Sequence, residues 1–556
     1  MAPKLPPSPP VPTGLLTYTP TAIDEIPSTV ASVRQAYGTL KTHNVDFRIT
    51  QLRKLYWAIE DYSDLLTKAL CQDLRMSSYE ADLLEINIVR GLILDTLSQI
   101  HSHVADEKVP NLPLTTLPTR VRIRKEPLGV VLIISPYNFP VQLSLSPAIS
   151  AIAAGCAFVL KPSESSSATS AVLTHIITSR LDPDVYRVVN GEVAETTALL
   201  DQKWDKIFYT GGNAVAKIIC KKAAETLTPV GLELGGLNPA FITPSANVAM
   251  AARRLMWPKL MNCGQVCVSQ NYALVDRKLV PEFIAALKKE YDLMFPQGAK
   301  QSSDLSRIIN ARQFARIKGY LDQTRGKVVI GGDTDETELF IGPTVVLVED
   351  EDDILIQNET FGPVWSILPV DSTDEAIAIA NRVCPTTLAI YPFGDSKETE
   401  KILSRVTSGG ATVNDGFLHA TIEPLPFGGV GQSGTGALHG RAGFDEFTHR
   451  RTVMINPTWT DAMFRVRYMP YKLAYLKQFR SISPKPDFGH DNQDLRGIMY
   501  WIKLVLGLGR GSSASGFLLR LALTAATVYV VVNSKDTDQE GWMGLVRRYT
   551  PGFLRA

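Results

Sequence analysis

Two cysteines stand close together in the segment MNCGQVCVSQ, residues 261–270. Cys263 and Cys267 are four positions apart, so on a helix they would share one face and could form a redox pair or half of a metal site. No further cluster of cysteine and histidine completes a ligand set, and we therefore predict no metal site. A thiolate can also attack a carbonyl carbon, although a single cysteine is more often a small apolar core residue.

Asn138 lies in the turn PYNFP at 136–140, directly after the apolar run at 130–135. An amide that rigid neighbours hold at the carboxyl end of a strand could donate a hydrogen bond to an oxyanion. The alternative is an asparagine that only tightens the turn. The segment by itself leaves both interpretations open.

Glu233 lies in the apolar segment GLELGG at 231–236. Burial disfavours the charged form of a carboxyl group and so raises its pKa, which suits a general base. The alternative is a buried structural glutamate that pairs with lysine or arginine.

Two further segments could bind a nucleotide. In KPSE at 161–164, Lys161 and Glu164 follow a predicted strand, where a cation and a carboxylate could contact ribose hydroxyls. In FYTGGN at 208–213, a strand enters a glycine turn and then a helix, which would bring backbone N–H groups close to a pyrophosphate. The G-x-G-x-x-G pattern is missing, so this turn alone does not predict a standard Rossmann site.

The elements around these residues must bring them together. Apolar residues at helical spacing over 47–74 and 79–100 predict an opening helical layer. After an alternating strand at 120–124, the sequence predicts strands at 130–135, 158–161, 186–190, 206–210 and 230–234, and helices at 144–156, 167–179 and 213–226. This alternation predicts an α/β fold with a parallel sheet covered on both faces, which binds ligands beyond the carboxyl ends of its strands. A second α/β stretch is expected from about 238 to 409.

In this order, the segments resemble the NAD(P)-dependent aldehyde dehydrogenase superfamily over residues 47–453. The sequence is most similar to the class 3 branch, which includes fatty aldehyde dehydrogenases, in YTGGNAV at 209–215, LTPVGLELGG at 227–236 and FGGVGQSGTG at 427–436. The resemblance implies two doubly wound α/β domains, one Rossmann-like for NAD and one with the catalytic thiol. It also implies a small bridging arm, a homodimer and the oxidation of an aldehyde to a carboxylic acid.

The same resemblance implies the catalytic roles. Cys267 matches the nucleophile, Glu233 the base that activates water, and Asn138 the side-chain donor of the oxyanion hole. Cys263 stands where the family requires no cysteine, and we interpret it as a bystander or a protective thiol.

The resemblance further implies a site for NAD, with NADP as an alternative. The matching residues are Lys161 and Glu164 at the adenine ribose, Gly211, Gly212, Asn213, Ala214, Val215 and Ala216 in the nucleotide turn, Glu359 at the nicotinamide ribose, and Phe361 beside the ring. Ala216 is a departure, because the class 3 turn usually has a second glycine there. Since Glu164 would repel a 2′-phosphate, the sequence favours NAD.

The chain is expected to divide into five parts. These are a proline-rich flexible tail at 1–30, the N-terminal helices and NAD-binding domain at 31–236, the catalytic cysteine domain at 237–410, a return to the NAD-binding domain with a bridging and oligomerisation arm at 411–464, and a basic C-terminal extension at 465–556.

The extension contains GFLLRLALTAATVYVVV at 516–532, in which Arg520 is the single charged residue. As a helix this segment would be about 26 Å long, near the lower limit for crossing a bilayer. From Arg465 onward there are 14 basic and 6 acidic residues, which suits an anionic membrane surface. We therefore expect a membrane-associated, helical tail and a catalytic body that faces the cytosol. The alternative is two buried helices that pack on the body or on a partner subunit.

Composition excludes other classes of function. The 57 basic and 56 acidic residues give a net charge of +1, and 45% of the residues are hydrophobic, so we expect neither nucleic-acid binding nor global disorder. A membrane tail favours a lipophilic aldehyde, either a long-chain fatty aldehyde or, by resemblance to fungal class 3 enzymes, an apocarotenoid aldehyde. The alternatives are an acylating semialdehyde dehydrogenase, which usually lacks the counterpart of Glu233, and an inactive membrane-anchored structural or binding protein.

Overall fold

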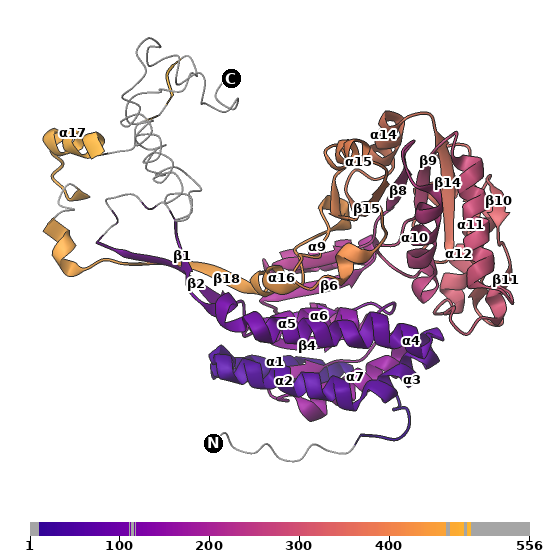
Figure 1. Cartoon of the computed structure of the whole chain (residues 1–556). Coiled ribbons are helices and arrows are strands. Elements are labelled where there is room, and N and C mark those ends of the chain that lie inside the picture. Colours follow the sequence, from indigo (N-terminus) through magenta and orange to yellow (C-terminus); the bar gives the residue numbers. More distant parts are fainter. Residues whose placement is uncertain are drawn as a thin grey trace, which may run out of the picture. The chain divides into compact units, whose positions relative to one another are not determined.

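The protein is described from a computed structural model of the whole chain (Figure 1). The structure describes residues 11–110, 112, 116, 118–462, 467–482, 486 and 488–490. The chain forms two compact units, one of residues 1–107 with 124–451 and one of residues 108–123 with 452–556. All the candidate site residues belong to the first unit.

The first unit begins with a layer of helices, indigo in Figure 1. Its main members are α1 (Ile26–Gly38), α2 (Val45–Asp61), α3 (Ser63–Leu74), α4 (Ser78–Ala81) and α5 (Asn87–Val104). The helical pattern at 47–74 is two helices, because the backbone of Tyr62 leaves helical geometry at φ −100° and ψ 8°. The pattern at 79–100 contains a π-helical turn, Asp82–Ile86, between α4 and α5.

A six-stranded sheet follows, with the order β17-β7-β6-β3-β4-β5. Its strands are β3 (Val130–Ile134), β4 (Ala157–Lys161), β5 (Tyr186–Val188), β6 (Lys206–Gly211), β7 (Val230–Leu234) and β17 (Gly434–Thr435). Neighbouring strands are parallel except for the short edge strand β17. The connecting helices are α6 (Gln142–Ala154), α7 (Ser167–Arg180), α8 (Val193–Leu200) and α9 (Asn213–Ala224). The doubly wound prediction for this part is confirmed, whereas the sequence did not predict α8.

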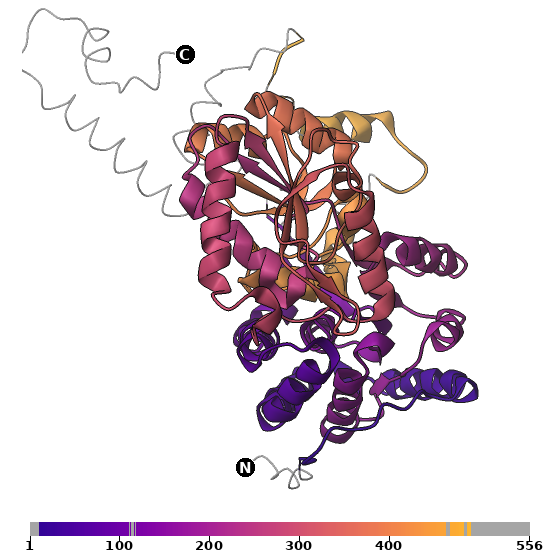
Figure 2. The ribbon, with the colours of Figure 1, turned by 90° about the vertical axis from the view of Figure 1, so that its right-hand side faces the viewer.

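A seven-stranded sheet carries the second half of the unit, with the order β10-β13-β14-β9-β8-β15-β16. The strands are β8 (Pro239–Ile242), β9 (Tyr272–Asp276), β10 (Lys327–Ile330), β13 (Thr344–Leu347), β14 (Val364–Val370), β15 (Thr387–Phe393) and β16 (Ser408–Ala411). A small hairpin pairs β11 (Thr334–Asp335) with β12 (Phe340–Ile341). Figure 2 shows helices packed around this sheet. They are α10 (Val248–Leu260), α11 (Val280–Met294), α12 (Ala311–Gln323), α13 (Ile354–Gln357), α14 (Thr373–Val383) and α15 (Ser396–Leu403).

After the second sheet the chain returns to the first. It adds β17 beside β7, and then α16 (Gly440–Glu446), which packs against α5 and α6. A separate three-stranded sheet has the order β1-β2-β18, with β1 (Glu107–Lys108), β2 (Arg120–Pro127) and β18 (Thr448–Ile455). The last described helix is α17 (Leu473–Ile482).

Within the described part of the chain, no helix is long and apolar enough to cross a membrane. The anchor predicted at 516–532 lies outside the described residues. The expected membrane-associated tail therefore stays a prediction.

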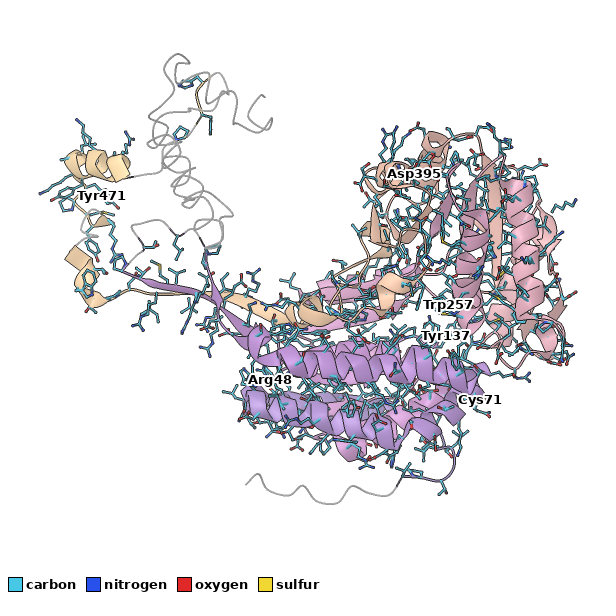
Figure 3. All side chains as sticks on the ribbon, viewed as in Figure 1. Arg48, Cys71, Tyr137, Trp257, Asp395 and Tyr471 are labelled. Atoms are coloured by element: carbon cyan, nitrogen blue, oxygen red, sulfur yellow. The ribbon has the colours of Figure 1, made fainter. Side chains whose placement is uncertain are left out.

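A buried arginine joins the helical layer to the helix that follows β3. Arg48, labelled in Figure 3, is 5% exposed, and its guanidinium donates to the carbonyl oxygens of Thr42 at 2.7 Å, Ala153 at 3.0 Å and His43 at 3.1 Å. A Cβ atom at residue 155 would lie 2.4 Å from Nη2 of Arg48, so Gly155 leaves the room that the guanidinium needs. The ends of α2 and α6 are thereby tied together through one side chain.

We expect Arg48→Met to lower the free energy of unfolding by about 3 kcal/mol, because three carbonyl oxygens lose a charged donor in the interior. The measurement is the midpoint of guanidinium-induced unfolding. Arg53→Met, at an exposed position of the same helix, is the matched control. Equal midpoints for the two variants would contradict the structural role of Arg48.

Candidate active site

A cavity of about 590 Å³ opens at the carboxyl ends of β3, β4, β6 and β7. Its volume lies in the range of pockets that enclose small molecules and cofactors. Strands of the first sheet, and loops and helix α12 of the second half of the unit, line it. Most of the predicted site residues are among the lining residues: Asn138, Lys161, Glu164, Gly211, Gly212, Val215, Glu233, Cys267, Glu359 and Phe361. Residues that are far apart in the sequence therefore face one space.

The other three predicted residues, Asn213, Ala214 and Ala216, do not line the cavity. They occupy the first turn of α9, where the helical repeat directs side chains away from one another. Ala216 is 2% exposed and packs into the core, and Nδ2 of Asn213 donates to the carbonyl oxygen of Gln432 at 3.1 Å. The Ala216 methyl thus occupies the core side of the helix, which explains why an alanine is accommodated there.

Cys267 follows a tight turn that starts where α10 ends. Three consecutive residues, Asn262, Cys263 and Gly264, have positive φ angles of 45°, 53° and 71°. For the two residues with side chains, this conformation costs on the order of 1 kcal/mol each, so the surroundings must hold it.

Hydrogen bonds hold this turn from both sides. Nδ2 of Asn262 donates to the carbonyl oxygen of Asn138 at 2.5 Å, and the Asn262 N–H donates to Oε1 of Glu80 at 2.9 Å. The Gln265 side chain accepts from the Ile309 N–H at 3.1 Å. The sequence analysis missed Glu80 and Asn262, because their partners are remote in sequence.

The thiol of Cys267 is surrounded by acidic groups. Burial raises its pKa to about 12, and the negative charges of Glu359 and Glu233 act in the same direction. Its carbonyl oxygen accepts a hydrogen bond from Nδ2 of Asn238 at 2.8 Å. The resting group is therefore a thiol, and it must lose its proton before it can attack.

Asn138 is 2% exposed, and its Nδ2 donates to the carbonyl oxygen of Gln265 at 2.9 Å. Because an amide nitrogen carries two hydrogens, the second remains for a ligand in the cavity. The backbone oxygen of Asn138 accepts from Asn262, so the position of Asn138 is fixed relative to the turn at residues 262–264.

Glu233 is 3% exposed on β7, and among the described residues neither of its carboxylate oxygens has a hydrogen-bond partner. Burial, followed by the nearby negative charge of Glu446, raises its pKa well above the usual range. The alternative of a glutamate paired with lysine or arginine is thus not what the structure contains. An unpartnered carboxyl group beside a thiol can hold and transfer a proton.

The end of the cavity near β4 is polar. Nζ of Lys161 lies 2.7 Å from Oε2 of Glu164, and both side chains line the cavity. At the start of α9, a Cβ atom on Gly212 would have no atom within 4 Å, so the backbone is open to a ligand there. Backbone N–H groups at a helix start favour anions.

Glu359 also lines the cavity. Burial raises its pKa to about 7, while Arg316, Lys259 and the Gly236 N–H favour its charged form. A Cβ atom at residue 235 would lie 2.4 Å from Oε2 of Glu359, so Gly235 leaves room for the carboxylate. A partly titrating carboxyl group therefore lies close to the Cys267 thiol.

The wall around Phe361 contains residues that the sequence analysis missed. Phe361 has φ 46°, and its ring meets that of Tyr137 edge to face at 6.1 Å (Tyr137 is labelled in Figure 3). Arg316 donates to the carbonyl oxygens of Glu359 at 3.0 Å and Thr360 at 2.9 Å. Arg312 and Gln313 of α12 also line the cavity. A polar stripe on one face of this helix is the sequence signal that could have indicated them.

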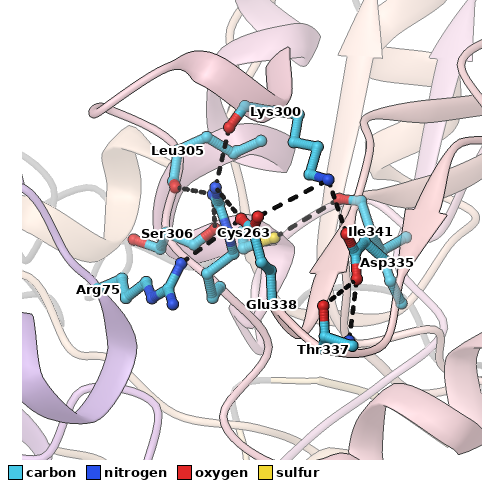
Figure 4. Close-up of polar contacts among 10 residues, drawn as sticks. Arg75, Cys263, Lys300, Leu305, Ser306, Asp335, Thr337, Glu338 and Ile341 are labelled. Carbon is cyan, nitrogen blue, oxygen red and sulfur yellow. Dashed lines mark hydrogen bonds and ion pairs between the residues drawn. The ribbon is translucent and has the colours of Figure 1, made fainter.

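Cys263 faces away from this chemistry. It is fully buried, does not line the cavity, and its Sγ lies 4.0 Å from the carbonyl oxygen of Ile341 (Figure 4). Burial raises the pKa of its thiol to about 12. No group of histidine, cysteine and acidic residues that could hold a metal ion occurs among the described residues.

Comparison with known proteins identifies the family. Residues 13–453 match the aldehyde dehydrogenase family. The chain is 50% identical over 511 residues to the beta-apo-4'-carotenal oxygenase of Neurospora crassa, which covers 92% of this chain and 96% of that protein. It is 39% identical over 462 residues to aldehyde dehydrogenase family 3 member H1 of Arabidopsis thaliana, with 82% and 95% covered. The chain belongs to the aldehyde dehydrogenase family, and the resemblance in the sequence is confirmed.

Solved structures agree with this assignment. The substrate-bound state of AldH from Staphylococcus aureus is 35% identical with a TM-score of 0.78, covering 82% of this chain and 99% of that one. The NAD⁺ complex of an aldehyde dehydrogenase from Bacillus cereus is 26% identical with a TM-score of 0.71, covering 79% and 93%. The protein is an oxidoreductase that acts on aldehydes and uses NAD(P).

We expect Gly264→Ala to lower aldehyde oxidation more than 100-fold, on the order of 3 kcal/mol in activation free energy. A Cβ atom there would lie 2.2 Å from the Gly362 carbonyl oxygen at φ +71°, so the turn that leads to Cys267 must shift. Gly298→Ala is the control, because Gly298 also has positive φ (+90°) but no atom within 4 Å of its Cβ position. Steady-state kcat is the measurement, and similar losses in both variants would contradict the argument.

Proposed function

We propose that the enzyme oxidises a lipophilic aldehyde to its carboxylic acid through a thioester on Cys267, which water hydrolyses with the help of Glu233. The observation that carries the proposal is the cavity in which Cys267, Glu233 and Asn138 meet. The retained Glu233 favours hydrolysis over transfer of the acyl group to coenzyme A.

The Cys267 thiol first gives its proton to water, and the thiolate sulfur then attacks the aldehyde carbon. The oxygen of the aldehyde then becomes an oxyanion, which the Asn138 amide and the Cys267 backbone N–H stabilise as donors. These donors are already oriented, since Asn138 is fixed by Gln265 and by Asn262.

The same cavity fits a dinucleotide. Lys161 and Glu164 would hold the adenine ribose, the Gly211–Gly212 turn the pyrophosphate, and Glu359 and Phe361 the nicotinamide end. The nicotinamide, when bound, accepts the hydride that leaves the substrate carbon. Glu164 would disfavour a 2′-phosphate, so we expect NAD to be preferred over NADP.

Hydrolysis of the thioester depends on Glu233. Its carboxylate takes a proton from water, the oxygen of that water attacks the thioester carbon, and the Cys267 sulfur leaves. A raised pKa makes Glu233 a stronger base once it is ionised. It also reduces the ionised fraction at low pH, so we expect the hydrolysis rate to fall as the pH falls.

We expect Cys267→Ala to abolish turnover, and Glu233→Gln to give about one rapid equivalent of NADH per active site followed by a steady state at least about 100-fold slower. Stopped-flow absorbance of NADH is the measurement. Cys263→Ala serves as the control, because that thiol lies outside the cavity. Loss of the rapid phase in Glu233→Gln would show that Glu233 is needed before hydrolysis.

The substrate class is supported by the relatives and by the tail. A protein with half of its aligned residues identical to this chain is named for an apocarotenal, and the class 3 resemblance supports a fatty aldehyde. Both aldehydes partition into membranes.

We expect a higher kcat/KM for beta-apo-4'-carotenal or for hexadecanal than for propanal, by at least about tenfold, or about 1.4 kcal/mol. NADH formation with each aldehyde in detergent-free vesicles is the measurement. An equal preference for propanal would contradict a lipophilic substrate.

We further propose that the basic segment after residue 464 holds the enzyme, as a homodimer, at a membrane with the catalytic body in the cytosol. The apolar run at 516–532 and the surplus of basic residues support this. A chain that stops at Asp494 should move from the membrane fraction to the supernatant and keep its kcat for propanal. Unchanged sedimentation would contradict the anchor.

A further inference from the structure

A second carboxylate lies beside Glu233 and has no role in the steps above. Glu446 is the last residue of α16, and its side chain is 13% exposed. A Cβ atom on Gly231 of β7 would lie 2.6 Å from Oε1 of Glu446, and one on Gly436 would lie 2.5 Å from the same oxygen. The two glycines thus leave the space that this carboxylate fills.

The filled space lies on the same face of β7 as the Glu233 side chain. Side chains two positions apart on a strand point to one face, with their Cα atoms about 7 Å apart. The Glu446 carboxylate occupies the place of a side chain at residue 231, and Glu233 is two residues further along. The two carboxylates are therefore neighbours, and the charge of Glu446 contributes to the raised pKa of Glu233.

A cation balances Glu446 but not Glu233. Nζ of Lys206 forms an ion pair with Oε1 of Glu446, and the Lys206 side chain is 8% exposed. In the register of β6 and β7, Phe208 is opposite Gly231, and Lys206 is two residues before Phe208 on the same face. Buried ion pairs of this kind are strongly sensitive to loss of one partner.

The remaining neighbours of Glu233 are residues beside it in the sheet, which do not titrate, and groups across the cavity, which do. Its strand partners are Thr210 on β6 and Gly434 on β17, neither of which titrates near neutral pH. Gly428 also approaches, since a Cβ atom there would lie 3.1 Å from Oε1 of Glu233. Across the cavity, Cys267 and Glu359 also titrate, and the charges of Glu359 and Glu233 both act on the thiol.

We propose that the Glu446–Lys206 pair shifts the pH at which Glu233 ionises beyond the effect of burial, and that Glu446 is a positioning residue for thioester hydrolysis. The inference rests on the proposed function, because it assigns Glu233 as the base. The negative charge of Glu446 raises the pH at which Glu233 ionises, and the positive charge of Lys206 offsets part of that effect. Removal of Glu446 must then lower the pH at which Glu233 ionises, and removal of Lys206 must raise it.

The test uses the full-length enzyme with p-nitrophenyl acetate and no cofactor. Attack of Cys267 releases p-nitrophenol in a burst and leaves an acetyl thioester, and water then releases acetate and restores the thiol. The steady rate after the burst therefore reports hydrolysis, and its dependence on pH reports the ionisation of Glu233.

We expect the acid limb of the steady rate to shift down by about 1 pH unit in Glu446→Gln and up in Lys206→Met. The double variant should lie between Glu446→Gln and the wild type, because both charges are gone and the nearer one was negative. The double variant also provides the test if one single variant fails to fold, because a neutral pair is better tolerated in the interior than a single charge. Glu225→Gln and Lys222→Met are the controls, because Lys222 and Glu225 form an exposed ion pair at 2.7 Å.

Shifts of the two single variants in the same direction, or no shift with an intact burst, would overturn the inference. Infrared titration provides a second measurement. The C=O band that is absent in Glu233→Gln should disappear at lower pH in Glu446→Gln than in the wild type. A missing burst in the wild type would instead contradict the thioester on Cys267, and the infrared titration would still decide the role of Glu446.

Discussion

The hydrogen bond from the Asn262 side chain to the Asn138 carbonyl oxygen fixes the geometry on which the site depends. One end belongs to the turn after β3 of the first sheet, and the other to the turn that leads to Cys267. The N–H of Asn262 is bound by Glu80 of the helical layer at the same time. One strained residue, Asn262, therefore connects three parts of the fold, and the turn to Cys267 and the Asn138 segment are held as a unit.

Acidic groups dominate the space around that unit. The pKa values of Glu233 and Glu359 are raised by burial, and both carboxyl groups raise the pKa of the Cys267 thiol in turn. Three such groups that share one cavity disfavour one another's charged forms. The charge state of each must therefore change with the state of the others during a reaction cycle.

Local patterns predicted the first sheet well, because β3 and β7 are apolar runs bounded by turns, and motifs indicated Cys267 and Glu233. Local patterns failed where contacts between residues far apart in the sequence determine the structure. Tyr62 breaks a continuous helical pattern, and the residues that support the site, such as Glu80 and Glu446, act on partners far away in the sequence. No short segment contains both members of such a pair, so their role becomes visible only when the chain is folded.

The position of Glu446 at the end of the first unit has a consequence for synthesis of the chain. Cys267, Asn138 and Glu233 all leave the ribosome well before α16 does. Until α16 packs against the helices before it, the face of β7 that bears Glu233 lacks its neighbouring ion pair and is open to water. A nascent or truncated chain can thus contain every reactive group and still lack the Glu446–Lys206 ion pair beside Glu233. The chain is expected to become able to react only when the first unit is complete.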